Sequence, residues 1–111
     1  MALNINQYDL DLLLIITTES NLHNAKRLAR IIMEKNISAC INFSNINSIY
    51  WWEGKLQETS EVQLLIKTKP ELKDEVFKTI VNEHTYKIPE LISFKVSSSQ
   101  EYNQWIRNNI S

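Results

Sequence analysis

The spacing of hydrophobic and polar residues divides the chain into strand-like and helix-like segments. Residues 10–16 form a nearly continuous apolar run, which is typical of a strand buried on both faces. A polar turn follows at residues 17–21. From Leu22 onward apolar residues recur at helical spacing, which predicts a helix that stops near Asn36. A second apolar strand is expected at residues 37–43.

The middle of the chain has the pattern of a long β-hairpin. Residues 46–52 and 56–68 are both strand-like, and residues 53–55 between them are typical of a hairpin turn. This turn contains the only glycine of the sequence. The pattern therefore predicts two long antiparallel strands joined at a tight connection.

The last third of the chain predicts a helix, a strand and a second helix. Thr68 and Glu71 have the spacing of a capping box, which favours the start of a helix that continues over residues 72–81. Residues 88–96 read as a last strand. A second capping box beginning at Ser98 predicts a short terminal helix.

This order of elements, β-α-β-β-α-β followed by a helix, predicts an α+β fold. Two βαβ units joined by a hairpin make the ferredoxin-like split βαβ sandwich, in which two helices cover one face of an antiparallel sheet. Neither a linker nor a low-complexity segment nor a repeat divides the chain. We therefore expect residues 1–111 to form a single domain with a long protruding β-hairpin and an extra C-terminal helix.

Three large aromatic residues, Tyr50, Trp51 and Trp52, follow one another in the hairpin. Neighbouring strand residues point to opposite faces, so aromatic side chains are expected on both faces of a ribbon that projects beyond the helices. Such a surface is prone to aggregation unless it is covered. We therefore expect other copies of the chain to cover it. The alternative is that Tyr50 and Trp52 belong to the local core and Trp51 is simply exposed.

Charge and cysteine content restrict the partners and the compartment. The net charge is −1 and the twelve Lys and Arg residues are scattered, so neither nucleic acid nor an anionic membrane is expected as the main partner. We find no signal-peptide pattern and no apolar run near the roughly 20 residues that span a bilayer. Cys40 is the only cysteine, which fits a reducing compartment. A cytoplasmic location is expected.

Candidate metal ligands are few and are not spaced as a recognisable motif. His23 is expected on a helix surface, and Cys40 in an apolar strand is expected to act mainly as a small hydrophobic residue. His84 follows Glu83 at the end of the second helix. It either interacts with the helix dipole or binds Cu(II) or Zn(II) with help from Glu83, Glu90 or a neighbouring subunit. We take His84, Glu83 and Cys40 as the candidate metal ligands.

Catalytic motifs are not recognisable in the sequence. No G-x-S-x-G motif or glycine-rich phosphate loop is present, since the chain has a single glycine. No pairing of a nucleophile with a base follows from the spacing of its residues. We therefore do not expect an enzyme.

Several spaced motifs resemble those of one known family. They are Leu28-Ala29-Arg30 through Ser38-Ala39-Cys40-Ile41-Asn42, Ser48-Ile49-Tyr50-Trp51-Trp52-Glu53-Gly54-Lys55 with Glu61-Val62, Lys67-Thr68, His84-Thr85-Tyr86-Lys87-Ile88-Pro89-Glu90-Leu91, and Tyr102 with Trp105. Together they resemble the CutA family, the divalent-cation tolerance proteins, over nearly the full length of the chain. The resemblance implies a tight homotrimer built through the hairpin, with Tyr50, Trp51, Trp52 and Trp105 at the interface. It also implies a role in tolerance or homeostasis of divalent cations.

The resemblance carries over only part of a metal site. In copper-associated members of this family the proposed ligands are a cysteine leaving the first strand and a His-His pair before Pro-Tyr. Here Thr17 and Thr18 follow the first strand, with no cysteine. Glu83-His84 stands at the position of the His-His pair, and Thr85 at the position of the proline. Only His84 keeps its place, so the resemblance implies weak, pH-dependent binding of Cu(II) or another divalent cation.

The predicted architecture also resembles that of PII-type signalling proteins, which bind small effectors between subunits. Lys67, Tyr86 and Glu90, with Tyr50 or Trp52, are the candidate lining of such a cleft, for a small anionic or metabolite ligand. Alternatively, Lys67 and Glu90 form an ordinary ion pair or are solvated. A third possibility is a stable trimeric scaffold for another protein.

Overall fold

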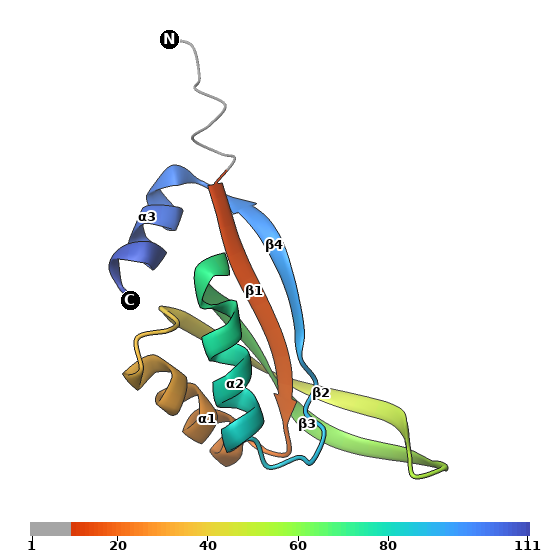
Figure 1. The fold of residues 1–111 in the computed structure, drawn as a ribbon. Coiled ribbons are helices and arrows are strands. Elements are labelled where there is room, and N and C mark those ends of the chain that lie inside the picture. Colours follow the sequence, from red (N-terminus) through yellow and green to blue (C-terminus); the bar gives the residue numbers. More distant parts are fainter. Residues whose placement is uncertain (1–9) are drawn as a thin grey trace.

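An antiparallel four-stranded sheet of strand order β2-β3-β1-β4 is the centre of the computed structural model, which describes residues 10–111 (Figure 1). The first nine residues of the predicted domain lie outside the described residues. The strands are β1 (Leu10–Glu19), β2 (Cys40–Trp52), β3 (Lys55–Thr68) and β4 (Ile92–Ser98). The helices are α1 (Leu22–Glu34), a 3₁₀ turn η2 (Pro70–Leu72), α2 (Lys73–Glu83) and α3 (Gln100–Asn108). This is the predicted ferredoxin-like order with an additional C-terminal helix.

The core lies between α1, α2 and one face of the sheet (Figure 1). Alternate residues of the central strands point toward the helices, as the period of a strand requires. The fully buried side chains of this cluster are Ile15, Ala25, Leu28, Ile32, Leu64, Ile66, Val76 and Ile80. Burying each of the larger ones contributes about 1.5–3 kcal/mol relative to leaving it in water.

Two strands are longer than the sequence pattern predicts. Residues 17–19 continue β1 instead of forming a turn, because they pair with β3 as far as Glu19 opposite Val62. β2 is one continuous strand from Cys40 to Trp52, since its ladder with β3 is unbroken from end to end. The predicted start of this strand at residue 37 is wrong, because β2 begins only at Cys40.

The predicted capping boxes are only partly correct. The Thr68 hydroxyl does not cap a helix but donates to the Ile37 carbonyl oxygen at 2.7 Å, and the chain enters α2 through the 3₁₀ turn. At α3 the cap is Ser99, whose hydroxyl accepts from the Tyr102 backbone N–H at 3.2 Å. The predicted strand at 88–96 begins only at Ile92, so residues 84–91 form a loop.

The hairpin turn consists of two residues, Glu53 and Gly54, which both have positive φ (51° and 76°). Two consecutive left-handed residues make a type I′ turn, whose twist matches that of the flanking strands. β1 covers β3 only from Val62 to Thr68, so residues 55–61 of β3 pair with β2 alone. The tip of the hairpin therefore projects from the rest of the molecule (Figure 1).

Helix α3 is fastened to the beginning of β1. The side chains of Asn103 and Arg107 both donate to the Asp11 carbonyl oxygen at 3.1 Å. Beyond the helix, the Ser111 backbone N–H donates to the Asn36 carbonyl oxygen at 2.8 Å. The C-terminal segment thus closes one end of the sandwich, away from the hairpin tip.

Candidate functional site

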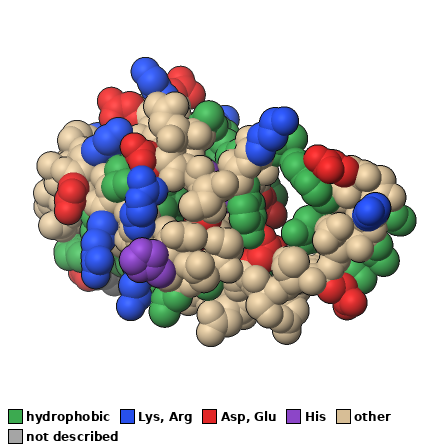
Figure 2. All heavy atoms as spheres, turned by 90° about the horizontal axis from the view of Figure 1, so that it is seen from below, with side chains coloured by type: hydrophobic (Ala, Val, Ile, Leu, Met, Phe, Trp, Pro, Cys, Tyr) green, Lys and Arg blue, Asp and Glu red, His purple; other side chains and the backbone are tan. Residues whose placement is uncertain are grey.

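A groove of about 780 Å³ lies between the base of the hairpin and the loop of residues 84–91. Figure 2 shows a hollow between the projecting hairpin and the body of the molecule, with hydrophobic and acidic side chains beside it. The groove is lined by Thr18, Ser48, Ile49, Tyr50, Trp52, Glu61, Thr85, Tyr86, Lys87, Ile88, Pro89 and Glu90. Its volume lies in the range of about 300–1,000 Å³ that is typical of small-molecule sites.

The buried carboxylate of Glu19 holds the loop against the end of β1. Its side chain is fully buried. It accepts hydrogen bonds from the backbone N–H groups of Ser20 and Thr85, both at 3.1 Å, and a short one from the Thr85 hydroxyl. These bonds tie the first part of the loop to the sheet, and so fix one wall of the groove.

His84 is a second buried anchor of the loop. The Tyr86 backbone N–H donates to His84 Nδ1 at 2.9 Å, so the proton of the neutral ring lies on Nε2. Nε2 then donates to the Thr18 carbonyl oxygen at 2.5 Å. Glu19 Oε2 lies 3.6 Å from His84 Nδ1. The two form an ion pair only when the imidazole ring carries a second proton. With both ring nitrogens engaged, a metal bound at His84 would have to displace one of these bonds.

Tyr86 links the loop to the hairpin. Its hydroxyl donates to Glu61 Oε1 at 2.8 Å, and Glu61 is only 8% exposed. Burial, and then the hydrogen bond to Glu61 and its charge, raise the pKa of the Tyr86 hydroxyl well above its ordinary value. Tyr86 therefore remains a protonated donor across the physiological pH range.

Two carboxylates give the groove an excess of negative charge. Burial of its carboxyl group and the nearby charge of Glu61 raise the pKa of Glu90, although other parts of this residue are exposed. In residues 10–111, no Lys, Arg or His nitrogen lies within ion-pair distance of Glu61 or Glu90. Lys87 is the cationic residue of the lining.

The raised pKa of Glu90 predicts how stability depends on pH. A raised folded-state pKa means that ionising Glu90 lowers the free energy of unfolding. This loss of stability is absent below the pKa of Glu90 in the unfolded chain, and it grows as the pH rises through the pKa in the folded chain. We expect Glu90→Gln to raise the urea midpoint at pH 7 but to leave it unchanged at pH 3.5. The exposed residue Glu34 on α1 provides a control, since Glu34→Gln is expected to change neither midpoint. If Glu90→Gln shifts the urea midpoint equally at pH 7 and pH 3.5, ionisation of Glu90 is not what lowers the stability.

Four of the five residues predicted to line a ligand cleft come together in the groove, namely Tyr50, Trp52, Tyr86 and Glu90. Lys67 does not. In the sheet it pairs with Leu14, four residues before Thr18, which is about 13 Å along the strand. Its ammonium lies 5.8 Å from the centre of the Tyr102 ring, beside α3. Within one chain Lys67 therefore lies apart from this groove, and its predicted place in a cleft between subunits stays a prediction.

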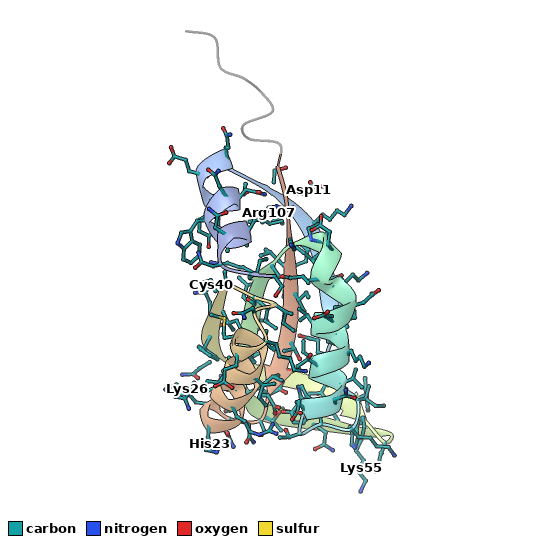
Figure 3. All side chains as sticks on the ribbon, turned by 60° about the vertical axis from the view of Figure 1, so that its left-hand side comes forward. Asp11, His23, Lys26, Cys40, Lys55 and Arg107 are labelled. Atoms are coloured by element: carbon teal, nitrogen blue, oxygen red, sulfur yellow. The ribbon has the colours of Figure 1, made fainter. Side chains whose placement is uncertain are left out.

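The candidate metal ligands are not brought together in this protomer. Glu83 forms an ion pair with Arg27 at 2.8 Å. Cys40 lies opposite Lys67 near α3, at the opposite end of β2 from the hairpin tip, where Lys55 marks the turn (Figure 3). In the described part of the chain, no three His, Cys, Asp or Glu side chains are grouped to hold a metal ion. His23 is exposed on α1, as expected (Figure 3).

Two important residues, Glu19 and Glu61, were not among the predicted site residues. Glu19 continues the inward alternation Leu13, Ile15, Thr17 of β1. An acidic residue at an inward position of a strand is the signal that could have identified it, because a buried carboxylate needs several donors. Glu61 stands in one of the sequence motifs, but its contact with Tyr86 depends on the path of a loop 25 residues further along.

Comparison with known proteins gives consistent matches. A family model described as CutA1 divalent ion tolerance protein matches residues 13–109. A rice protein (Oryza sativa subsp. japonica) named Protein CutA 1, chloroplastic, is 35% identical over 98 residues, which are 86% of this chain and 55% of that protein. A Thermotoga maritima protein named Divalent-cation tolerance protein CutA is 30% identical over 100 residues, which are 89% of this chain and 99% of that protein.

The fold is also that of solved structures. The periplasmic divalent cation tolerance protein CutA from Archaeoglobus fulgidus superposes with a TM-score of 0.87 at 30% identity, covering 90% of this chain and 99% of that one. The chain spans about half the length of the rice, Danio rerio and Arabidopsis thaliana relatives. Over residues 10–111, no helix is long and apolar enough to cross a membrane.

Proposed function

The chain belongs to the CutA1 divalent ion tolerance family, and from this premise we propose that it serves tolerance or homeostasis of divalent cations as a homotrimer. The role itself comes from the family description and from the names of the relatives. The homotrimer rests on surfaces of this chain that need a cover. We further propose that the protein acts by binding and not by catalysis, and that it does so in the cytoplasm, although its relatives include chloroplastic and periplasmic proteins.

The observation that carries the trimer is an apolar cluster on the hairpin face that continues the helix-covered side of the sheet beyond the helices; we call it the outer hairpin face. Trp51 pairs with Leu56, and Ile49 lies two residues before Trp51 on the same face. Their exposed fractions are 73%, 57% and 62%. Such a cluster on a ribbon that lacks a helical layer is the kind of surface that subunit contacts bury.

A second apolar surface supports the same conclusion. The helices α1 and α2 cover one face of the sheet, and the other face carries Leu14, Ile16, Leu65, Ile92 and Phe94. Ile92 and Phe94 on the edge strand are 49% and 42% exposed. Copies that pack through this face and through the hairpin would also protect the free edge of β4.

Light scattering of the intact protein tests the assembly. The expected mass is about three times the 13.0 kDa of the chain. A monomer would show that the exposed hairpin face does not require a cover, and the trimer would have to be abandoned.

We propose that direct binding of Cu(II) or another divalent cation is weak. The ligands suggested by the sequence are dispersed, and His84 has to exchange a hydrogen bond for the metal. Calorimetric titration of metal-free protein with Cu(II) and with Zn(II) at pH 7 is expected to give a dissociation constant no tighter than about 1 µM. His84→Gln, whose amide keeps partners for Tyr86 and Thr18, is expected to weaken binding at least tenfold.

His23→Gln is the matched control, because it removes the other histidine from an exposed position. Equal loss in both variants would indicate unspecific surface binding. Unchanged binding in His84→Gln would exclude His84 as the ligand.

A sensor of small anions gains no support from the groove. Its lining has two carboxylates and one lysine, and Lys67, the cation on which that alternative depended, lies elsewhere.

A further inference from the structure

We propose that the groove between the hairpin and the loop binds an organic ammonium ligand, a primary amine attached to an apolar body. This goes beyond the role in divalent-cation tolerance and does not depend on it. The proposal combines a buried carboxylate without a counter-ion, aromatic walls and the size of the groove.

Glu61 supplies the charge that the ligand would neutralise. It is nine-tenths buried, and buried charges are normally paired, because leaving water is costly for an ion. Only its Oε1 has a donor, the Tyr86 hydroxyl, which is neutral. In residues 10–111 of a single chain no hydrogen-bond donor contacts Oε2, which stays accessible from the groove, and no cation lies within 4 Å of the carboxylate. An ammonium group in the groove would provide both.

Glu90 adds to this charge from the loop side of the groove. Burial and then the charge of Glu61 raise the pKa of Glu90. Against them the lining offers one cationic residue, Lys87, which is exposed. By formal count the lining has two acidic residues and one basic residue, an excess that suits a singly charged cation.

The walls of the groove suit an apolar body next to that cation. Tyr50, Trp52 and Tyr86 contribute three aromatic side chains, and Ile88 and Pro89 contribute aliphatic surface. Aromatic faces attract ammonium groups and also pack against apolar groups. A ligand with a charged end and an apolar end can use both properties at once.

The same features disfavour the other simple ligand classes. A metal ion is far smaller than a groove of about 780 Å³, and the described residues offer it no third clustered ligand. An anion would be repelled by Glu61 and Glu90. A quaternary ammonium lacks the N–H that Glu61 Oε2 can accept, so a primary amine fits better.

Three probes with the same phenyl body test the charge requirement. They are 2-phenylethylamine, 2-phenylethanol and 3-phenylpropanoate, each titrated into the intact wild-type protein at pH 7 and followed by ligand-observed NMR. We expect the amine to bind at least tenfold tighter than the alcohol or the carboxylate. Equal binding of amine and alcohol would overturn the proposal, because the site would then be merely apolar.

Variants locate the site. Glu61→Gln keeps an oxygen for the Tyr86 hydroxyl and is expected to weaken amine binding at least tenfold, since hydrogen bonds to charged groups are the strong ones. Glu34→Gln removes the same charge from an exposed position of α1 outside the groove and is expected to change nothing. If Glu61→Gln does not fold, Glu90→Gln and Trp52→Leu serve instead, each with an expected loss of about threefold or more.

A Zn(II) titration separates the amine from a metal site. Binding of Zn(II) that Glu61→Gln abolishes, together with no binding of the amine, would overturn the proposal in favour of a metal ion. Amine binding that survives in Glu61→Gln and in Glu90→Gln would also overturn it. Neither result depends on the mass measured by light scattering, so the trimer and the amine site are tested separately.

Discussion

Replacing Glu19 with alanine is expected to lower the free energy of unfolding by about 2–3 kcal/mol. The fully buried carboxylate accepts three hydrogen bonds, two of them from Thr85, and removing it leaves these partly buried donors without that acceptor. The loss is a large part of the roughly 5–15 kcal/mol that stabilises a typical domain. Urea denaturation at pH 7 measures it.

Two further variants make the Glu19 result interpretable. Glu19→Gln keeps the shape and one oxygen, so we expect a smaller loss than for alanine. Glu34→Ala removes an exposed glutamate from α1 and is expected to change stability by less than about 0.5 kcal/mol. If Glu19→Ala costs no more than Glu34→Ala, the hydrogen bonds between β1 and the loop do not stabilise the fold.

Replacing Trp51 with glutamate is expected to convert the proposed trimer into monomers. Trp51 is 73% exposed in the single chain and lies at the centre of the outer hairpin face, next to Leu56. Aromatic residues at the centre of an interface carry much of its binding energy, and a carboxylate buried there without a partner is strongly unfavourable. In light scattering the mass should fall to about that of one chain, 13.0 kDa.

Thr59→Glu is the matched control for this experiment. Thr59 is exposed on the same hairpin, but it pairs with Ser48 and points to the opposite face from Trp51. We expect its mass to stay that of the wild type. A trimer that tolerates Trp51→Glu, or that Thr59→Glu disrupts equally, would show that the outer hairpin face is not the interface.

Much of the fold could be predicted because its signals are local. The apolar period predicted a helix from Leu22 to near Asn36, and α1 runs from Leu22 to Glu34. The single glycine marked the hairpin turn. Tyr50 and Trp52, predicted as the aromatic wall of a cleft between subunits, both line the groove of the single chain. In such cases the residues that determine the structure are neighbours in the sequence.

The path of the loop could not be predicted, because contacts distant in sequence determine it. Residues 88–91 have the pattern of a strand, and continuing the β1–β4 register would place residue 90 opposite Thr18. The Thr18 carbonyl oxygen instead accepts a bond from His84, and Glu19 holds Thr85. The loop therefore leaves the sheet before Ile92. For the same reason the sequence could not show that Lys67 lies apart from the groove of a single chain.

The order of the strands also determines when the chain can fold. The central strand β1 is the first to be synthesised, yet both of its neighbours, β3 and β4, come from later parts of the chain. Contacts so distant in sequence slow folding, because a long loop must close before they form. A nascent chain that ends before Ile92 already contains β1, α1, β2, β3 and α2. It lacks β4, so one edge of β1 stays unpaired. Folding of this protein is therefore completed only when its last third has been made.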